Sequence, residues 1–191
     1  MENLYKKNAR VLVIEPSNQG PAFEKARPNG NLGPAYIVGA LRKYRIEVDY
    51  LDAIVGQKGR DLNETFYRKL EMENGNIRYG MDPGEFPEIF SNYDIIITSS
   101  IFTVQTRMHF EIAAITKKVA RKNGKEILTV SGGVNARALR EHFLSNGFDI
   151  IALAEGEITI IQIADQFSSD KPDYSKVERI AFRKNDKTII T

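Results

Sequence analysis

Small and hydroxyl-bearing residues follow three apolar segments in the second half of the sequence. The three turns are Ser99-Ser100 after residues 94–98, Ser131-Gly132-Gly133 after residues 126–130, and Ala154-Glu155-Gly156-Glu157 after residues 149–153. Small side chains let a ligand approach the backbone closely, and a helix that begins in such a turn directs N–H groups at the ligand. One turn of this kind is common, but three in succession indicate a shared ligand site.

The loop after the first apolar segment also favours a functional role. About 18 residues separate the apolar residues 11–14 from a helix predicted to begin near Pro34. A link between a strand and a helix usually takes about two to six residues. A loop of this length in a compact α/β protein is therefore expected to contact a ligand.

Several common ligands of α/β proteins do not fit these turns. Residues 15–20 lack the Gly-x-Gly-x-x-Gly pattern of a dinucleotide site, and no phosphate loop ending in Gly-Lys-Ser/Thr occurs. A phospho-receiver domain needs an Asp after the third strand and a Lys after the fifth, and neither is present. Ser131 lacks the Gly-x-Ser-x-Gly turn of a hydrolase. His109 and His142 lie in predicted helices, where we expect structural roles.

A repeat of strand, turn and helix must position the turns. The predicted strands are residues 11–14, 48–51, 94–98, 126–130 and 149–153. Their alternation with helices predicts an α/β, doubly wound, flavodoxin-like or Rossmann-like sheet of five parallel strands with helices on both faces. Ligands of such sheets bind beyond the carboxyl ends of the strands, where the turns would converge.

Residues 53–93 are the least regular part of the sequence. We expect one amphipathic helix there, with Leu62, Phe66 and Leu70 on one face, because these apolar residues recur at helical spacing. A second, short helix is predicted near Phe86 and Phe90.

The end of the sequence has a different pattern. Two short apolar segments flank Asn185-Asp186, which predicts a small β-hairpin. We therefore divide the sequence into a ligand-binding domain, residues 1–167, and a linker with a hairpin, residues 168–191.

The composition narrows the function further. The 191 residues are 42% hydrophobic and carry a net charge of +2, without a clustered basic segment, so nucleic-acid binding is not expected. No apolar run reaches the roughly 18 residues of a membrane span, and we expect a cytoplasmic protein without a membrane partner. The sequence has no cysteine, which excludes disulfides, a Cys nucleophile and Cys-ligated clusters within this chain.

Several segments together resemble a known family. Residues 32–43 and 47–53, with residues 78–81 and 94–100, resemble the cobalamin-binding domain of cobalamin-dependent radical S-adenosylmethionine enzymes. The most specific pieces are Ser131-Gly132-Gly133 and Ala154-Glu155-Gly156-Glu157, which are similar to that family's Gly-Gly turn and Gly-Glu-Gly-Glu signature. Alanine stands at position 154 where the family commonly has glycine. The resemblance covers about residues 10 to 190 and includes the tail, which is similar to the segment before the family's catalytic barrel.

The resemblance implies that cobalamin binds with its nucleotide tail extended between the sheet and its covering helices, in a slot lined by small side chains. The implied cofactor-binding residues are Gln19, Asn31, Leu32, Gly33, Ser99, Ser100, Ile101, Thr103, Ser131, Gly132, Gly133, Val134, Ala154, Glu155, Gly156 and Glu157. No histidine lies between Glu15 and Pro34, so we expect no His or Cys ligand to cobalt. The cofactor would be base-off and His-off, with Gln19, Asn31, a water or nothing beneath cobalt.

The family's radical chemistry requires a further domain. S-adenosylmethionine and a four-iron cluster bind there through Cys-x-x-x-Cys-x-x-Cys in a following barrel, and this sequence has no cysteine. We therefore expect those cofactors only in an absent barrel, in cis or in trans, and no catalytic residue or activity in this chain alone. The parent enzyme is expected to be a methyltransferase or a related carbon-skeleton enzyme. We favour an N-terminal domain separated from its barrel, because the sequence stops where the family's linker would begin.

Two alternatives remain open. The first is a non-catalytic sensor or interaction module of the same fold that binds another ligand or a protein partner. The second, weaker alternative is a small α/β hydrolase or nucleotide enzyme, which the missing triad and phosphate loop disfavour.

Overall fold

A computed structural model gives the structure of this chain and describes residues 9–21 and 32–191. Among these residues, seven strands form the main sheet, in the order β10-β9-β8-β7-β6-β1-β3. The strands are β1 (Val11–Glu15), β3 (Val48–Asp52), β6 (Ile95–Ser99), β7 (Leu128–Gly132), β8 (Ile150–Ala152), β9 (Ile180–Lys184) and β10 (Lys187–Ile190). Short β-branched sequences such as that of β1 suit strands that are buried on both faces.

Five of the strands are parallel and have the order β3-β1-β6-β7-β8. This is the flavodoxin-like doubly wound order, in which the direction of winding changes between β1 and β6. The mixed α/β architecture with a parallel sheet is therefore confirmed.

The predicted C-terminal hairpin forms, but it is not a separate appendage. Strand β9 pairs antiparallel with β8 through Ile180, Ala181 and Phe182, which are all buried, and β10 pairs with β9. The main sheet thus has seven strands rather than the expected five, because the buried apolar residues of β9 pair with β8 and so add both hairpin strands to the sheet.

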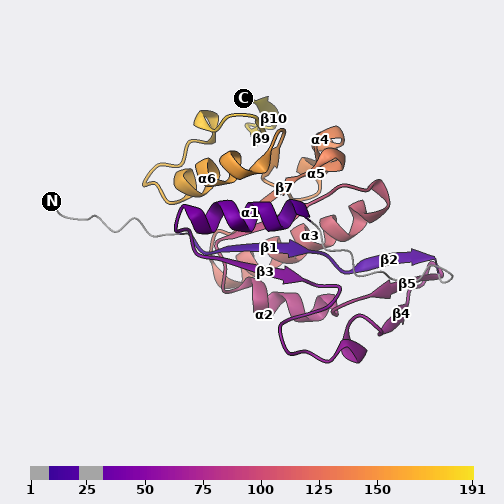
Figure 1. Cartoon of the computed structure of the whole chain (residues 1–191). Coiled ribbons are helices and arrows are strands. Elements are labelled where there is room, and N and C mark those ends of the chain that lie inside the picture. Colours follow the sequence, from indigo (N-terminus) through magenta and orange to yellow (C-terminus); the bar gives the residue numbers. More distant parts are fainter. Residues whose placement is uncertain (1–8, 22–31) are drawn as a thin grey trace.

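Helices cover both faces of this sheet (Figure 1). They are α1 (Leu32–Lys43), α2 (Phe86–Phe90), α3 (Thr106–Asn123), α4 (Val134–Ala138), α5 (Arg140–Ser145) and α6 (Gly156–Phe167). Apolar residues at alternate strand positions separate the two cores: Val13 and Ile97 face α1 and α6, whereas Leu12 and Ile96 face α2 and α3. The short helices α4 and α5 lie on the same face as α3, where Phe143 packs with Ala113 and Ile151.

A second sheet of three strands lies beyond the carboxyl end of β1 (Figure 1). It has the order β2-β5-β4, with β2 (Asn18–Pro21), β5 (Asn76–Tyr79) and β4 (Lys69–Glu71). Short 3-10 helices complete the description: η1 (Leu62–Glu64), η2 (Pro83–Glu85), η3 (Thr103–Gln105) and η4 (Tyr174–Lys176).

The expected amphipathic helix over Leu62, Phe66 and Leu70 is wrong. Only the single turn η1 forms, capped by the side chain of Asp61, and Leu70 lies in β4 opposite Arg78 of β5. Strand β4 instead pairs antiparallel with β5, the next strand in the chain, in a hairpin around Asn74-Gly75, where Gly75 has φ +78°. The short helix predicted near Phe86 and Phe90 is confirmed as α2.

Candidate functional site

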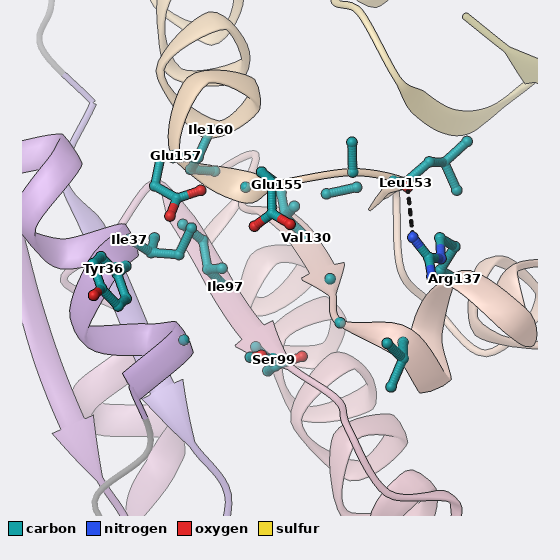
Figure 2. A pocket seen from close by; sticks show the side chains of 18 of the residues that line it. Tyr36, Ile37, Ile97, Ser99, Val130, Arg137, Leu153, Glu155, Glu157 and Ile160 are labelled. Atoms are coloured by element: carbon teal, nitrogen blue, oxygen red, sulfur yellow. Dashed lines mark hydrogen bonds between the residues drawn. The ribbon is translucent and has the colours of Figure 1, made fainter.

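A cleft of about 370 Å³ lies where the carboxyl ends of β6, β7 and β8 meet α1 and α6 (Figure 2). Three turns and two helices contribute to it: the turns after β6, β7 and β8, the start of α1, and the first half of α6. The cleft is therefore at the edge of the sheet where doubly wound proteins bind their ligands.

Apolar and small side chains form the interior of the cleft. Ile97, Val130 and Ile160 are buried residues of the core that also line it. Beside them, Gly132 leaves open space, since a Cβ atom built there would meet only the Cβ of Ala152, at 3.6 Å. The lack of side-chain volume at Gly132 and Ala152 thus keeps the space between sheet and helices open.

Gly133 has a different role from Gly132. Its φ is +89°, and a Cβ atom there would lie 2.4 Å from the carbonyl oxygen of Ser100. The close approach lets the backbone N–H of Asn135 donate to that oxygen at 3.1 Å, and the N–H of Ser100 donates to Gly132 O at 2.8 Å. Glycine at 133 therefore joins the turn after β7 to the turn after β6.

A buried polar network supports the same two turns. The side-chain amide of Asn135 donates to Ser100 Oγ and to Thr106 Oγ1, both at 2.8 Å, and all three residues are buried. Nearby, Thr98 Oγ1 donates to Ser131 Oγ at 3.1 Å. Buried polar groups that are hydrogen-bonded to one another stabilise a single local conformation.

The three serines of these turns lie either on the surface of the cleft or behind its wall. Ser99 lines the cleft, whereas Ser100 and Ser131 are fully buried and lie outside its lining. Their hydroxyl groups bond to neighbouring side chains of the protein. Ser100 and Ser131 therefore support the walls of the cleft from behind.

Three charged side chains line the cleft. Glu157 lies on the side of Tyr36 and Ile37, Glu155 lies in the middle, and Arg137 lies on the other side, next to Leu153 (Figure 2). None of the three charged residues forms a salt bridge among the residues that the structure describes. The cleft thus combines an apolar interior with a cationic side and a carboxylate-bearing side.

Ten of the residues expected from the sequence come together at this cleft. They are Gly33, Ser99, Ile101, Gly132, Gly133, Val134, Ala154, Glu155, Gly156 and Glu157. The turns after β6, β7 and β8 and the start of α1 therefore converge as the fold predicts.

Other expected residues lie elsewhere. Leu32 is 72% exposed at the start of α1, and Thr103 begins η3. Gln19 lies in β2, accepts a hydrogen bond from Arg78 Nη2 at 3.2 Å, and lines a different cavity beside α3. Asn31 is outside the described residues.

The sequence analysis missed several lining residues. Strand residues such as Ile97 and Val130 lie two positions before residues that were selected, so the alternation of strand side chains could have identified them. Arg137 gave no comparable signal, because its position depends on the turn that Gly133 makes. The other missed residues are Tyr36, Ile37, Thr98, Ala152, Leu153, Ile160 and Ile163.

The described residues contain neither a metal-binding cluster nor a membrane-spanning helix. No group of three or more His, Cys, Asp or Glu side chains within residues 9–21 and 32–191 could hold a metal ion. In the same part of the chain, no helix is both long and apolar enough to span a membrane.

Comparison with known proteins gives a consistent set of relatives. No protein-family model matches the sequence. Over 182 residues the chain is 26% identical to cytidylyl-2-hydroxyethylphosphonate methyltransferase from Streptomyces wedmorensis, and the match covers 93% of this chain and 32% of that protein.

Two solved enzymes share the fold. The cobalamin-dependent S-adenosylmethionine radical enzyme OxsB, with aqua-cobalamin and S-adenosylmethionine bound, matches with a TM-score of 0.69 and 17% identity over 97% of this chain and 22% of OxsB. The radical S-adenosylmethionine methyltransferase TsrM from Kitasatospora setae matches with a TM-score of 0.68 and 15% identity over 96% of this chain and 30% of TsrM. This chain spans about a third or less of each relative. It therefore has the fold of one part of the cobalamin-dependent radical S-adenosylmethionine enzymes, which confirms the resemblance seen in its sequence.

Proposed function

We propose that this chain is a cobalamin-binding domain that presents the cofactor to radical S-adenosylmethionine chemistry in another domain, in cis or in trans. The cleft between α1, α6 and the sheet is the observation that carries the proposal, because it joins the residues of the family's Gly-Gly and Gly-Glu-Gly-Glu motifs. The related structures are described with cobalamin bound, and this chain matches less than a third of their length.

The cleft fits the nucleotide tail of cobalamin. The tail ends in a flat apolar base, which suits the interior formed by Ile97, Val130 and Ile160. Gly132 and Ala152 leave the depth that the base needs between sheet and helices. A cleft of about 370 Å³ takes the tail but not the much larger corrin ring, which would remain outside, over the carboxyl ends of the strands.

This binding mode separates the base from cobalt. The base would lie inside the cleft, so it could not coordinate the cobalt of the ring outside, and the cofactor would be base-off. His109 in α3 and His142 in α5 are the two histidines of the chain, and neither lines the cleft. We therefore propose a His-off cofactor as well.

The protein's own residues would hold and orient the cofactor. Bound cobalamin supplies a cobalt atom that can carry a methyl group. The turns at Gly132 and Gly133 would let the tail approach the backbone, and the apolar interior would exclude water from the base. S-adenosylmethionine and a four-iron cluster would bind in the other domain, since this chain has no cysteine.

The parent enzyme is proposed to be a methyltransferase. This rests on the names of two relatives, which are methyltransferases and of which this chain spans about a third or less. We further propose that residues 1–167 bind the cofactor and that residues 168–191 lead toward the catalytic barrel, as the sequence resemblance implies.

Visible spectroscopy tests the cofactor directly. The chain is mixed with hydroxocobalamin, passed through gel filtration, and its spectrum is recorded. We expect a corrinoid that co-elutes with the protein and has a base-off spectrum. Protein that elutes without a corrinoid would contradict the proposed function, whereas a base-on spectrum would contradict only the tail-in-cleft geometry.

A further inference from the structure

Arg137 is the one cationic side chain on the lining of the cleft within the described residues. Its only side-chain hydrogen bond there is a long one, from Nη1 to Leu153 O at 3.5 Å, and it forms no salt bridge among those residues. A guanidinium group has five N–H donors in a planar fork that matches phosphate oxygens. Most of the hydrogen-bonding capacity of Arg137 is therefore available to a ligand.

The backbone holds Arg137 in this position. Its N–H donates to Gly133 O at 3.0 Å, at the start of α4, and Gly133 is packed against the Ser100 carbonyl. The bond to Leu153 O directs the guanidinium along the wall formed by the turn after β8 (Figure 2). Arg137 is thus held next to the Gly-Gly turn without being neutralised there.

The two acidic residues of the cleft restrict where an anion could bind. Glu157 lies on the side of Tyr36, away from Arg137, with Glu155 between them (Figure 2). A negatively charged group would be repelled at the carboxylates and attracted at the guanidinium. An anionic part of a bound ligand is therefore expected only on the Arg137 side.

We propose that Arg137 binds the phosphodiester group of the cobalamin tail and so selects corrinoids that carry a nucleotide. The inference rests on the proposed function, since it assigns one charged group of the proposed ligand to one side chain. The phosphodiester is the only formally anionic group of the tail. Arg137 would act as a specificity-determining residue and would take no part in the chemistry of the cobalt.

The test compares three corrinoids that differ only in the tail. Cobalamin carries phosphate, ribose and base, cobinamide phosphate carries phosphate alone, and cobinamide carries none of the three. All are used as dicyano forms, so that cobalt has the same two ligands and the base is free in each. Affinities for the 191-residue chain are measured by equilibrium dialysis with detection of the corrin absorbance.

The wild-type chain is expected to bind cobinamide phosphate about tenfold more tightly than cobinamide. Arg137→Gln should lower the affinity for both phosphate-bearing corrinoids by about tenfold and leave the affinity for cobinamide unchanged. Arg137→Lys keeps the charge and should retain most of the preference. Higher salt should reduce the preference of the wild type, since the contact is between charges.

Arg121→Gln is the matched control. Arg121 is exposed in the last turn of α3 and outside the cleft, and the substitution changes the net charge equally. It should keep the wild-type preference.

Two kinds of result would contradict the role proposed for Arg137. Equal binding of all three corrinoids by the wild type, or equal weakening of all three by Arg137→Gln, would overturn the role of Arg137 while leaving the proposed function in place. A wild-type chain that binds no corrinoid would overturn the proposed function and this inference together.

Discussion

At the scale of single residues, the two adjacent glycines of the turn after β7 serve different purposes. Gly133 needs its positive φ and its lack of a side chain, because the backbone of Ser100 occupies the space that a Cβ would take. Gly132 has no such restriction, and its Cβ position is open toward the cleft. A side chain at 132 should therefore alter the cleft while the fold is preserved.

Gly132→Leu is expected to abolish cobalamin binding, a loss of at least about a hundredfold in affinity, because the new side chain would occupy the path of the tail. Binding is measured by spectral titration, and folding by circular dichroism and thermal unfolding. Gly39→Leu is the matched control, because Gly39 in α1 has nothing within 4 Å of its Cβ position and does not line the cleft. Equal binding by both variants would show that the tail does not enter the cleft.

His109 makes the stability of the protein depend on pH. It is 2% exposed in α3, its Nδ1 has no hydrogen-bond partner among residues 9–21 and 32–191, and burial lowers its pKa from 6.5 to about 4. The unfolded chain therefore binds a proton at higher pH than the folded chain does. The contribution of His109 to the free energy of unfolding should be fully present above about pH 6.5 and should fall by roughly 1 kcal/mol per pH unit as the pH drops toward 4.

Urea unfolding at several pH values measures this effect. His109→Gln should lose the part of the acid destabilisation that belongs to this side chain, so its stability should fall less steeply between pH 6.5 and 4 than that of the wild type. His142→Gln is the control, because His142 is the other histidine and is exposed in α5. If the His109 variant keeps the wild-type slope, another group causes the dependence.

At the scale of elements, Asn135 connects three segments behind the wall of the cleft. It lies at the start of α4 and bonds to Ser100, after β6, and to Thr106, in the first turn of α3. Removing its amide leaves two buried hydroxyl groups without this donor. Leaving these hydroxyl groups unpaired should lower the free energy of unfolding by about 2 kcal/mol.

We expect Asn135→Ala to lower the free energy of unfolding by about that amount and to weaken cobalamin binding several-fold, since the turns are less rigidly placed. Chemical denaturation and corrinoid titration measure the two effects. The matched control is Asn146→Ala, because Asn146 is exposed at the end of α5 and its side-chain amide bonds to the exposed His142. A stability change as small as that of the control would contradict the structural role of the Asn135 network.

The ends of helices and strands could be predicted where the residues that set them lie within one short segment. The stop of α3 at Asn123-Gly124 is an example, since Gly124 adopts φ +58° and accommodates the left-handed cap. The segment around Leu62, Phe66 and Leu70 had helical spacing but forms η1 and β4. Strand β4 pairs with β5 in a hairpin around Asn74-Gly75, so the turn after Leu70 decides the structure here and the helical spacing of the three apolar residues does not.

At the scale of the whole molecule, the C-terminal hairpin is part of the main sheet. Strand β9 pairs with β8, and Phe182 packs in the core on the α6 face, near Tyr174. The sheet is therefore continuous from β3 to β10. Because the sheet is continuous, we expect the hairpin and the parallel strands to unfold in one transition.

Phe182→Ala should lower the stability of the whole protein by about 3 kcal/mol and shift a single transition. Lys184→Ala, at an exposed position of the same strand, should leave the midpoint unchanged. The transition is followed by far-ultraviolet circular dichroism and by hydrogen exchange of β1 amides. An early separate step confined to residues 180–190 would show that the hairpin folds independently of the sheet.

The sequence by itself determined the five parallel strands, the convergence of the turns near Ser99, Gly132 and Glu155, and the resemblance to cobalamin-dependent radical enzymes. These features depend on local apolar patterns, on small residues at strand ends and on motif spacing, all of which are present in single segments. Only the tertiary structure decided that Ser100 and Ser131 support the cleft from behind and that β9 completes the sheet. It also placed Arg137 on the cleft wall, because such positions depend on contacts between segments that are distant in the chain.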